Sequence, residues 1–365
     1  MESKLLEIIK NISAADAAAV RAAEERQAKL AKPPGSLGVL EDISVKLAGI
    51  TGRVKNRVDN TRILVFAADN GVVSEGVSCT PMSVTASQVM NMTRHKTGMS
   101  AMAKEFGCSI DIYDMGIATP YCGNGIINRS LGAGTSDIAK GPAMSREACA
   151  AAIMTGIEAA DKAAADGIQA VGIGEMGIGN TTTSACVLAA LTGSDAQQVC
   201  GRGGGLTDSA FEHKKAVVAR ALELNRPDKD DPMDVLAKVG GFDLAAMTGA
   251  FIGCAANRMA GVADGYISTV AALCAVRLCP HVKDYIFLSH ASYEVGCVIA
   301  QEALRLRPCL LLGMRLGEGS GCPIMFQVMR AACSVMNGMA SFEEAAINDD
   351  YLDEIRKIDA FSVKK

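Results

Sequence analysis

Five short, continuous apolar runs alternate with segments of helical periodicity along most of this 365-residue chain. The runs cover residues 63–68, 109–113, 170–173, 285–288 and 309–312. Apolar runs without polar alternation are typical of strands buried on both faces, and intervening helices allow such strands to pair in parallel. The pattern therefore predicts an α/β fold with a Rossmann-like, mainly parallel sheet and flanking helices.

Helical periodicity also marks both ends of the chain, in residues 5–12, 40–50 and 324–335. The natural partners of the last of these helices are the helices at the N-terminus. The sequence thus predicts a small discontinuous helical domain, made from residues 1–60 together with 324–365, and a large α/β catalytic domain of residues 61–323.

A further helix is expected between the first two helical segments. Ser13 and Asp16 resemble a capping box at its start, and a Pro-Pro-Gly sequence ends it after Ala31. Three helices would then precede the first strand.

Composition narrows the class of protein. A hydrophobic fraction of 49% with 37 glycines and no tryptophan fits tight packing of helices on a sheet. The formal net charge of -4 supplies no field that would hold a polyanion, so no nucleic-acid partner is expected. The 13 cysteines include no C-x-x-C pair, which favours reduced thiols over a disulfide framework or a thiolate metal site.

Targeting signals are also missing from the sequence. No stretch approaches the roughly 18 consecutive apolar residues that span a bilayer, and the first residues lack a basic region followed by an apolar core. We expect a cytoplasmic protein without a membrane partner.

Each apolar run is followed by a polar or glycine-containing turn. The carboxyl ends of parallel strands meet at one edge of a sheet, and ligands bind in the crevice beyond that edge. We expect the following residues to gather there: Asp69-Asn70-Gly71, Asp114, Glu175, Ser289-His290 and Glu318.

The turn after the third run, residues 172–183, is rich in glycine and places a carboxylate beside a helix start. Glycine permits a close approach of the backbone, and the free N–H groups and hydroxyls of the helix start suit a phosphate. An ordinary tight turn with a helix cap is the alternative. The sequence predicts a phosphorylated substrate opposite Glu175, bound by Gly177, Gly179, Asn180, Thr181 and Thr182.

A second turn of similar character follows the last run, in residues 311–321. Here an apolar segment is followed by a glycine loop that contains Glu318, although a solvated loop glutamate is the simpler interpretation. We expect the two turns to form two walls of one active site.

Seven segments resemble one family when they are taken in order. The family is nicotinate-nucleotide:dimethylbenzimidazole phosphoribosyltransferase. Each motif alone is weak, but together they extend over about residues 32 to 325. The segments are residues 32–38, 66–72, 174–182, 201–206, 240–247, 264–269 and 316–321.

The resemblance implies transfer of 5-phosphoribose from nicotinate mononucleotide to an aromatic base such as 5,6-dimethylbenzimidazole, with release of nicotinate. The product would be an α-ribotide for the lower ligand of a cobamide such as cobalamin. The resemblance also implies that no metal or other cofactor is needed, and that the protein is a dimer.

Roles for the two glutamates follow from the resemblance. Glu318 matches the general base that removes the ring N–H proton of the acceptor as the ring nitrogen attacks the anomeric carbon of the ribose. Glu175 matches a second glutamate, which would assist the base, order water or stabilise positive charge on the ribose. The alternative for Glu175 is a structural carboxylate that accepts loop N–H groups.

The glycine loop Gly203, Gly204 and Gly205 resembles the nucleotide-binding loop of the family. A helix follows it and carries Lys214, which matches a lysine that pairs with the phosphate. Lys215 is the alternative in the neighbouring register, and a solvated surface lysine is the simpler interpretation of either.

The acceptor end departs from the family pattern in part. Thr80 and Gln88 lie in segments close to that pattern, and Met314, Arg315 and Leu316 would form the opposite wall. Asn70 stands where the family usually has histidine, so this position cannot titrate near neutral pH.

Two alternatives remain open from the sequence. One branch of the family, found as paired paralogous subunits, activates phenol or p-cresol, and this chain could act in such a heterodimer. The chain could also be a non-catalytic paralogous subunit, although the intact Glu175, Glu318 and glycine loops favour an enzyme.

Overall fold

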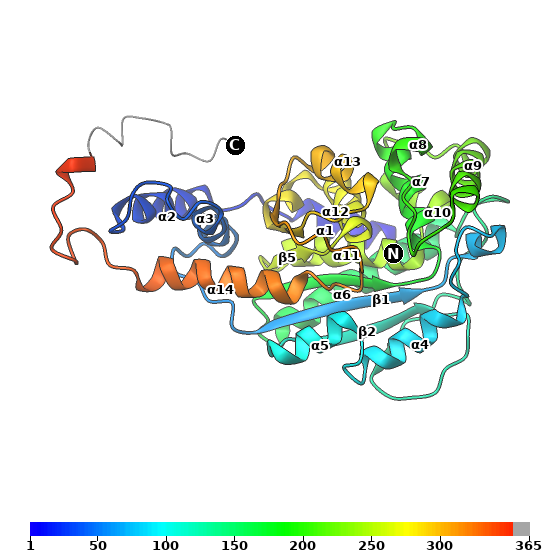
Figure 1. Ribbon diagram of the computed structural model, residues 1–365, viewed down its shortest axis with the longest axis horizontal. Helices are drawn as coiled ribbons and strands as arrows, with labels where there is room; N and C mark the ends of the chain where they lie inside the picture. Colours follow the sequence, from blue (N-terminus) through cyan, green and yellow to red (C-terminus); the bar gives the residue numbers. More distant parts are fainter. Residues whose placement is uncertain (353–365) are drawn as a thin grey trace.

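Seven parallel strands form the sheet in the computed structural model, which describes residues 1–352 (Figure 1). Their order is β3-β2-β1-β4-β5-β6-β7, so the direction of winding reverses between β1 and β4, where α/β sheets open a crevice. The predicted α/β fold class is confirmed. The strands are β1 (Thr61–Ala68), β2 (Ser109–Gly116), β3 (Ile126–Asn128), β4 (Ala170–Met176), β5 (Ala260–Ala263), β6 (Ile286–His290) and β7 (Pro308–Leu310).

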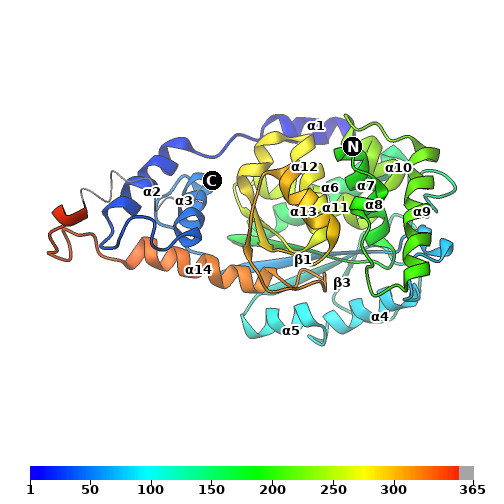
Figure 2. The same cartoon turned by 45° about the horizontal axis from the view of Figure 1, so that its top comes forward.

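Helices cover both faces of the sheet (Figure 2). On one face lie α4 (Ser83–Met92), α5 (Gly98–Glu105) and α14 (Cys322–Gly338). On the other lie α6 (Arg146–Ala165), α11 (Phe242–Ala256) and α12 (Tyr266–Leu278). Outside this second layer are α7 (Asn180–Thr192), α8 (Ala196–Val199), α9 (Asp208–Asn225), α10 (Pro232–Val239) and α13 (Val295–Leu304).

Each of the five predicted runs overlaps a strand, but two strands, β3 and β5, were not predicted. β3 has three residues, and β5 consists of four small or apolar residues between two apolar helices. The prediction for the last run was too long, because β7 ends at Leu310 and Leu311 is 84% exposed. β7 lies at the edge of the sheet, so the residues after it are not covered by a further strand.

Helices from both ends of the chain meet beside the sheet. α2 (Ala17–Lys29) and α3 (Val39–Thr51) pack on each other, and α14 extends from the sheet to α3. Ala19, Ala23, Ala48 and Met336 form a buried cluster there that is separate from the main core. The division into two domains stays a prediction, and residues 353–365 lie outside the described part of the chain.

The N-terminal helix α1 (Glu2–Lys10) packs elsewhere, against α6 and α11. Leu5 belongs to the main core, and Glu2 forms an ion pair with Arg146 at 2.8 Å. The predicted capping box was wrong, since α2 begins after Asp16, whose carboxylate accepts the N–H groups of Ala18 and Ala19. Asp16 itself is therefore the cap.

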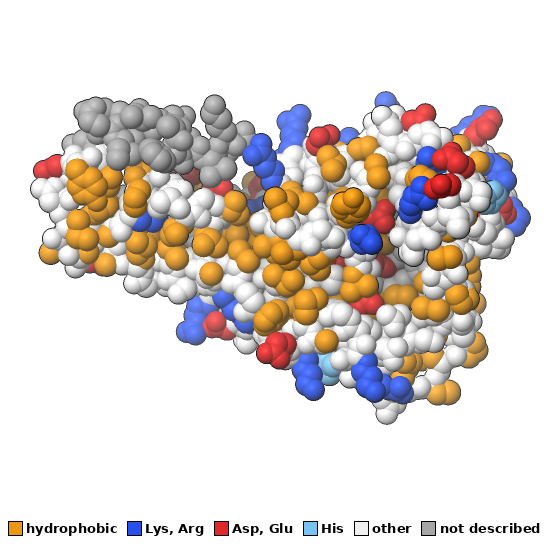
Figure 3. Space-filling model, in the orientation of Figure 1, with side chains coloured by type: hydrophobic (Ala, Val, Ile, Leu, Met, Phe, Trp, Pro, Cys, Tyr) orange, Lys and Arg blue, Asp and Glu red, His pale blue; other side chains and the backbone are white. Residues whose placement is uncertain are grey.

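Hydrophobic side chains form a band on the face that carries α14 (Figure 3). Several large exposed hydrophobic residues lie in residues 293–298 and 311–316. These two segments are neighbours in space, because the N–H of Tyr293 donates to the carbonyl oxygen of Met314 at 3.1 Å. The exposed residues are Tyr293, Val295, Val298, Leu311, Leu312 and Leu316. None of the helices within residues 1–352 has the length and apolar character needed to cross a membrane.

Helices α6 and α11 approach each other closely enough for their backbones to touch. A Cβ atom on Gly156 would overlap the carbonyl oxygen of Ala246, and one on Gly249 would overlap that of Ile153. Glycine is therefore required at both crossing points, because any side chain would force the helices apart. This contact fixes α11, whose first turn carries Asp243 behind the cavity described below.

The helix crossing gives the first prediction. Gly156→Ala should lower the free energy of unfolding by about 1–3 kcal/mol or more, because the added methyl group must displace backbone atoms. Urea denaturation followed by circular dichroism measures this change. Gly338→Ala in α14 is the matched control, since its Cβ would meet nothing within 4 Å and it should be neutral or slightly stabilising. Equal stability of the two variants would contradict the proposed backbone contact.

Candidate active site

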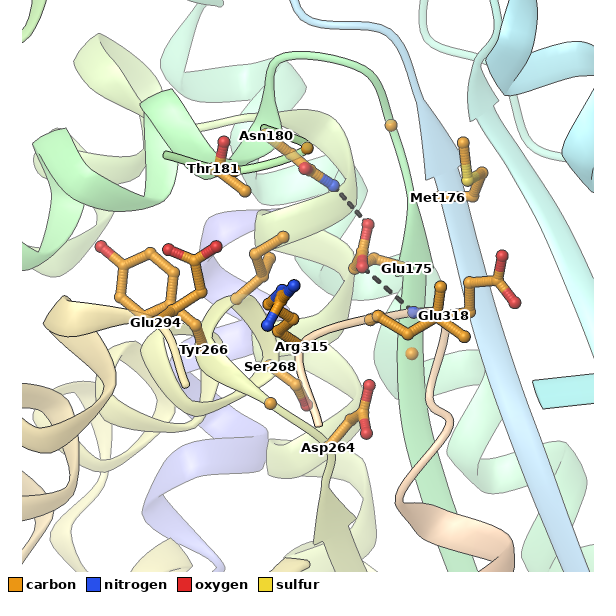
Figure 4. Close-up of a pocket in the computed structure, with 18 of the residues that line it drawn as sticks. Glu175, Met176, Asn180, Thr181, Asp264, Tyr266, Ser268, Glu294, Arg315 and Glu318 are labelled. Carbon is orange, nitrogen blue, oxygen red and sulfur yellow. Dashed lines mark hydrogen bonds between the residues drawn. The ribbon is translucent and has the colours of Figure 1, made fainter. Parts of the chain in front are cut away.

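A cavity of about 300 Å³ opens at the carboxyl ends of β4, β5 and β6 (Figure 4). In this view Thr181, Tyr266 and Glu294 lie on one side, Met176 and Glu318 lie on the other, and Glu175 stands between them. The cavity therefore has two ends with a carboxylate at its centre. Twelve predicted site residues line it: Thr80, Gln88, Glu175, Gly177, Gly179, Asn180, Thr181, Gly203, Gly204, Arg315, Leu316 and Glu318.

The two glycine turns meet at the centre of this cavity. The backbone N–H of Glu318 donates to Oε1 of Glu175 at 3.3 Å. A Cβ atom on Gly174 would lie 2.5 Å from the carbonyl oxygen of Glu318, and one on Gly317 would lie 2.6 Å from Glu175 Oε1. Glycine at both positions is what allows the turns to approach this closely.

The Glu318 side chain is buried, with 5% exposure, so it is not a solvated loop glutamate. Gln88 Nε2 donates to its Oε1 at 3.1 Å. The N–H of Met99, in the first turn of α5, lies 3.5 Å from its Oε2, and a helix N-terminus favours a negative charge. The φ angle of Glu318 is +64°, a left-handed conformation that the loop around it must maintain.

Asp264 holds that loop in place. It follows β5, and its carboxylate accepts the N–H groups of Gly319 at 3.0 Å and Gly321 at 2.6 Å. Burial raises the pKa of Asp264 to about 7. His290 Nδ1 lies 3.7 Å from the same carboxylate, and burial lowers the pKa of this histidine.

Glu175 belongs to a buried acidic network. Its Oε2 accepts a hydrogen bond from the side-chain amide of Asn180, which also donates to Asp243 Oδ2 at 3.2 Å. Burial, reinforced by the charge of Asp243, raises the pKa of Glu175 to about 8. Burial raises the pKa of Asp243 to about 6. Glu175 can therefore bind or release a proton near neutral pH.

The other end of the cavity has features that suit a phosphate. Asn180 and Thr181 begin α7 after Gly179, whose φ angle is +96°. Lys214 is buried, and its Nζ donates to Thr181 Oγ1 at 2.9 Å. Lys215 instead pairs with Glu212 at 2.8 Å and covers the ring of Phe211. The geometry thus favours Lys214 over Lys215.

Four predicted residues do not line the cavity in the described part of the chain. Thr182 is fully buried behind the turn, Lys214 lies behind the lining with its Nζ donating to Thr181, and Gly205 and Met314 lie outside the lining. Burial lowers the pKa of Lys214. The amine of Lys214 is thus held behind the helix start, where burial favours its neutral form.

Some residues expected at the rim support the cavity from behind. Asp69 is buried and accepts the hydroxyl of Thr85 at 2.6 Å and the N–H of Ala118 at 2.8 Å. Asn70 is also buried, and its Oδ1 accepts the hydroxyl of Thr183 at 3.3 Å. Asp114 accepts the hydroxyl of Tyr121 at 2.8 Å.

Other lining residues were missed by sequence reasoning. Asp264, Tyr266 and Ser268 follow β5, which had no distinct strand signal, although they fall in a segment that resembles the family. Glu294 lies beyond β6, and burial raises its pKa while Lys214 and Arg315 oppose the rise. An acid shortly after a predicted strand was the signal available for Glu294.

Comparison with known proteins defines the class of this chain. Residues 12–347 match a family model described as "Phosphoribosyltransferase". The chain therefore belongs to this phosphoribosyltransferase family.

Its relatives make the assignment more specific. A nicotinate-nucleotide–dimethylbenzimidazole phosphoribosyltransferase of Clostridium perfringens is 45% identical over 359 residues, which cover 98% of this chain and 99% of that protein. The protein of the same name from Acetivibrio thermocellus is 47% identical over 324 residues, covering 89% and 92%. The crystal structure of the Thermus thermophilus enzyme with this name superposes with a TM-score of 0.87 at 36% identity, covering 92% of this chain and 99% of that one.

The buried acids give a prediction for the dependence of stability on pH. A carboxyl group whose pKa is raised in the folded state binds a proton that the unfolded chain releases, so stability falls as pH rises from about 4.5 to about 8 for Glu175. Glu175→Gln removes this term. Between pH 5 and pH 8 the free energy of unfolding of the variant should fall less than that of the wild type, by on the order of 1 kcal/mol or more.

Urea denaturation at several pH values tests this prediction. A difference in the free energy of unfolding that is the same at every pH would report only the changed hydrogen bonds to Asn180. The diagnostic quantity is therefore the slope of the free energy of unfolding against pH. Parallel pH profiles for wild type and Glu175→Gln would contradict a raised pKa at this position.

Proposed function

We propose that this chain transfers 5-phosphoribose from nicotinate mononucleotide to 5,6-dimethylbenzimidazole and so makes an α-ribotide for a cobamide. The names of the relatives support this reaction. The observation that carries it is one cavity with a buried carboxylate, Glu318, at one end and the α7 helix start at the other. The two ends match an acceptor that must lose a proton and a donor that carries a phosphate.

The reaction balances with the groups present. A ring nitrogen of the acceptor forms a bond to C1′ of the ribose while the bond from C1′ to the nicotinate nitrogen breaks. The bonding electron pair returns to the pyridinium nitrogen, so nicotinate leaves without a proton. Glu318 accepts the ring N–H proton of the acceptor, and no general acid is required.

The phosphate would sit at the start of α7, against the N–H groups near Asn180 and Thr181 and the backbone of Gly203 and Gly204. Lys214 would act on it through Thr181, to which its Nζ donates. Glu175 stands between the two ends, where an ionised carboxylate would stabilise positive charge that develops on the ribose.

At the acceptor end, Gln88 presents a polar amide among the more apolar Val84, Met176 and Leu316. A benzimidazole has two nitrogen atoms that such a wall can accommodate, whereas a phenol has a single reacting oxygen. The relatives are named for dimethylbenzimidazole, and we therefore favour it over phenol or p-cresol.

The role of the base gives a direct test. Glu318→Gln should lower kcat for nicotinate release by about 10²–10⁴-fold, the usual contribution of a general base, while binding of nicotinate mononucleotide is retained. The effect is measured as nicotinate release, which is detected by chromatography. Parallel reactions contain dimethylbenzimidazole, phenol or p-cresol as the acceptor. Glu302→Gln, an exposed residue of α13, is the control and should keep full activity.

Each outcome of this assay has a distinct meaning. No turnover by the wild type with any of these acceptors would overturn the enzymatic proposal. Turnover with the phenols alone would replace the proposed acceptor. Full activity of Glu318→Gln would remove Glu318 from the mechanism.

We also propose that two copies of this chain associate through the exposed hydrophobic residues beside the cavity. Leu311, Leu316 and Tyr293 are 84%, 57% and 74% exposed, and Leu316 also lines the cavity. Apolar patches of this kind on a folded protein mark association surfaces. A second copy seated there would shield the acceptor end from water.

This association predicts a change of mass in solution. The wild type should sediment as a homodimer, and Leu311→Asp should shift it to monomer, because a buried unpaired carboxylate is costly at an apolar interface. Leu224→Asp on α9 replaces an exposed leucine of another surface and should leave the dimer intact. A monomeric wild type would contradict self-association and leave a paralogous partner as the alternative.

A further inference from the structure

The amide of Gln88 is held between two polar neighbours. Its Nε2 donates to Glu318 Oε1 at 3.1 Å, and its Oε1 accepts from Asn91 Nδ2 at 3.2 Å. Gln88 and Asn91 are both in α4, three residues apart, which places their side chains next to each other. Asn91 is half-buried and is absent from the cavity lining formed by residues 1–352.

The direction of this chain of hydrogen bonds follows from the chemistry of its ends. An ionised carboxylate only accepts hydrogen bonds, so Gln88 must turn its NH₂ group toward Glu318. The carbonyl end of the same amide then faces Asn91, which must present its own NH₂ group. A reversed Gln88 amide would place a carbonyl oxygen against the carboxylate and repel it.

We propose that Asn91 is a positioning residue for the reaction proposed above: it fixes the direction of the Gln88 amide, so that the NH₂ group holds the Glu318 carboxylate aimed at the acceptor. This inference rests on the proposed function for the role of Glu318 as the base and for the identity of the acceptor. The series of hydrogen bonds from Asn91 through Gln88 to Glu318 is formed by the protein's own side chains.

The surroundings of Glu318 make this donor important. Within residues 1–352, the second donor to the Glu318 carboxylate besides Gln88 is the N–H of Met99, at the long distance of 3.5 Å. The titratable groups on the neighbouring elements are Glu175 on β4, Asp264 after β5 and His290 on β6. The two acids disfavour a further negative charge, so the loss of one donor should leave the ionised carboxylate of Glu318 less stabilised and less well oriented toward the acceptor.

The side chain of Asn91 can be replaced without loss of the backbone hydrogen bonds at this position. The backbone carbonyl of Asn91 accepts the N–H groups of Arg94 and Lys96, and these contacts persist with any side chain. Asn91→Asp keeps the shape but offers acceptors only, so the Gln88 NH₂ group should turn toward residue 91. Asn91→Leu removes the partner without reversing the amide. Ser87→Ala, on an exposed position of the same helix, is the matched control.

Steady-state kinetics provide the first readout. Asn91→Asp should lower kcat/KM for dimethylbenzimidazole by about tenfold or more, the value of one hydrogen bond to a charged group. The acid limb of its pH–rate profile should move to higher pH, and the KM for nicotinate mononucleotide should not change. Asn91→Leu should show a smaller loss, and Ser87→Ala should show none.

A double-mutant cycle separates positioning from a general loss of helix structure. In a Gln88→Leu background, Asn91→Asp should have little further effect on kcat/KM, because the amide that it controls is gone. Equal losses in the two backgrounds, or an unchanged pH profile for Asn91→Asp, would overturn the proposal.

A second readout requires neither turnover nor ligand. In protein labelled with ¹⁵N at glutamine, the Gln88 side-chain signals are identified by their loss in Gln88→Leu. These signals should be displaced in Asn91→Asp relative to the wild type, because the Gln88 amide is reversed. Identical Gln88 signals in the two proteins would overturn the positioning role. Absence of turnover by the wild type, with the expected signals, would overturn the proposed function and leave the positioning role supported.

Discussion

The hydrogen bond from the Glu318 backbone to the Glu175 carboxylate joins two turns that are 143 residues apart in sequence. At position 174 a side chain would meet the backbone of Glu318, and at position 317 the φ angle of +86° favours glycine. The hydrogen bond brings the end of β4 and the loop after β7 into one cavity. Both the proposed phosphate end and the proposed acceptor end are placed relative to this contact.

Burial of acids is the main electrostatic property of the site. Glu175, Asp243 and Asp264 lie in an environment that raises the pKa of each carboxyl group. Such burial destabilises the empty protein when the groups are ionised. Under the proposed reaction, the pyridinium of the donor and the developing positive charge on the ribose would face Glu175 and Asp264, which line the cavity. The same charges that weaken the fold would then favour the transition state.

The sequence was sufficient for five of the seven strands and for the two turns, because uninterrupted apolar runs and a glutamate among glycines are local signals. It was insufficient where a property depends on distant neighbours. β5 has the composition of its flanking helices, and Leu311 is exposed only because β7 is an edge strand. Asp264 stands just before a helix, where an acid is commonly a cap. Its hydrogen bonds to the Glu318 loop can be seen only in the three-dimensional structure.

Asp264 binds the loop through the N–H groups of Gly319 and Gly321, and it makes no use of the side chain at position 318. The shape of the loop is therefore set independently of the group that it carries. Because residue 318 has a φ angle of +64°, side chains that tolerate this conformation, such as Asn or Asp, could be placed there while the contacts with Asp264 remain. The loop is thus a natural starting point for engineering transferases with new acceptors.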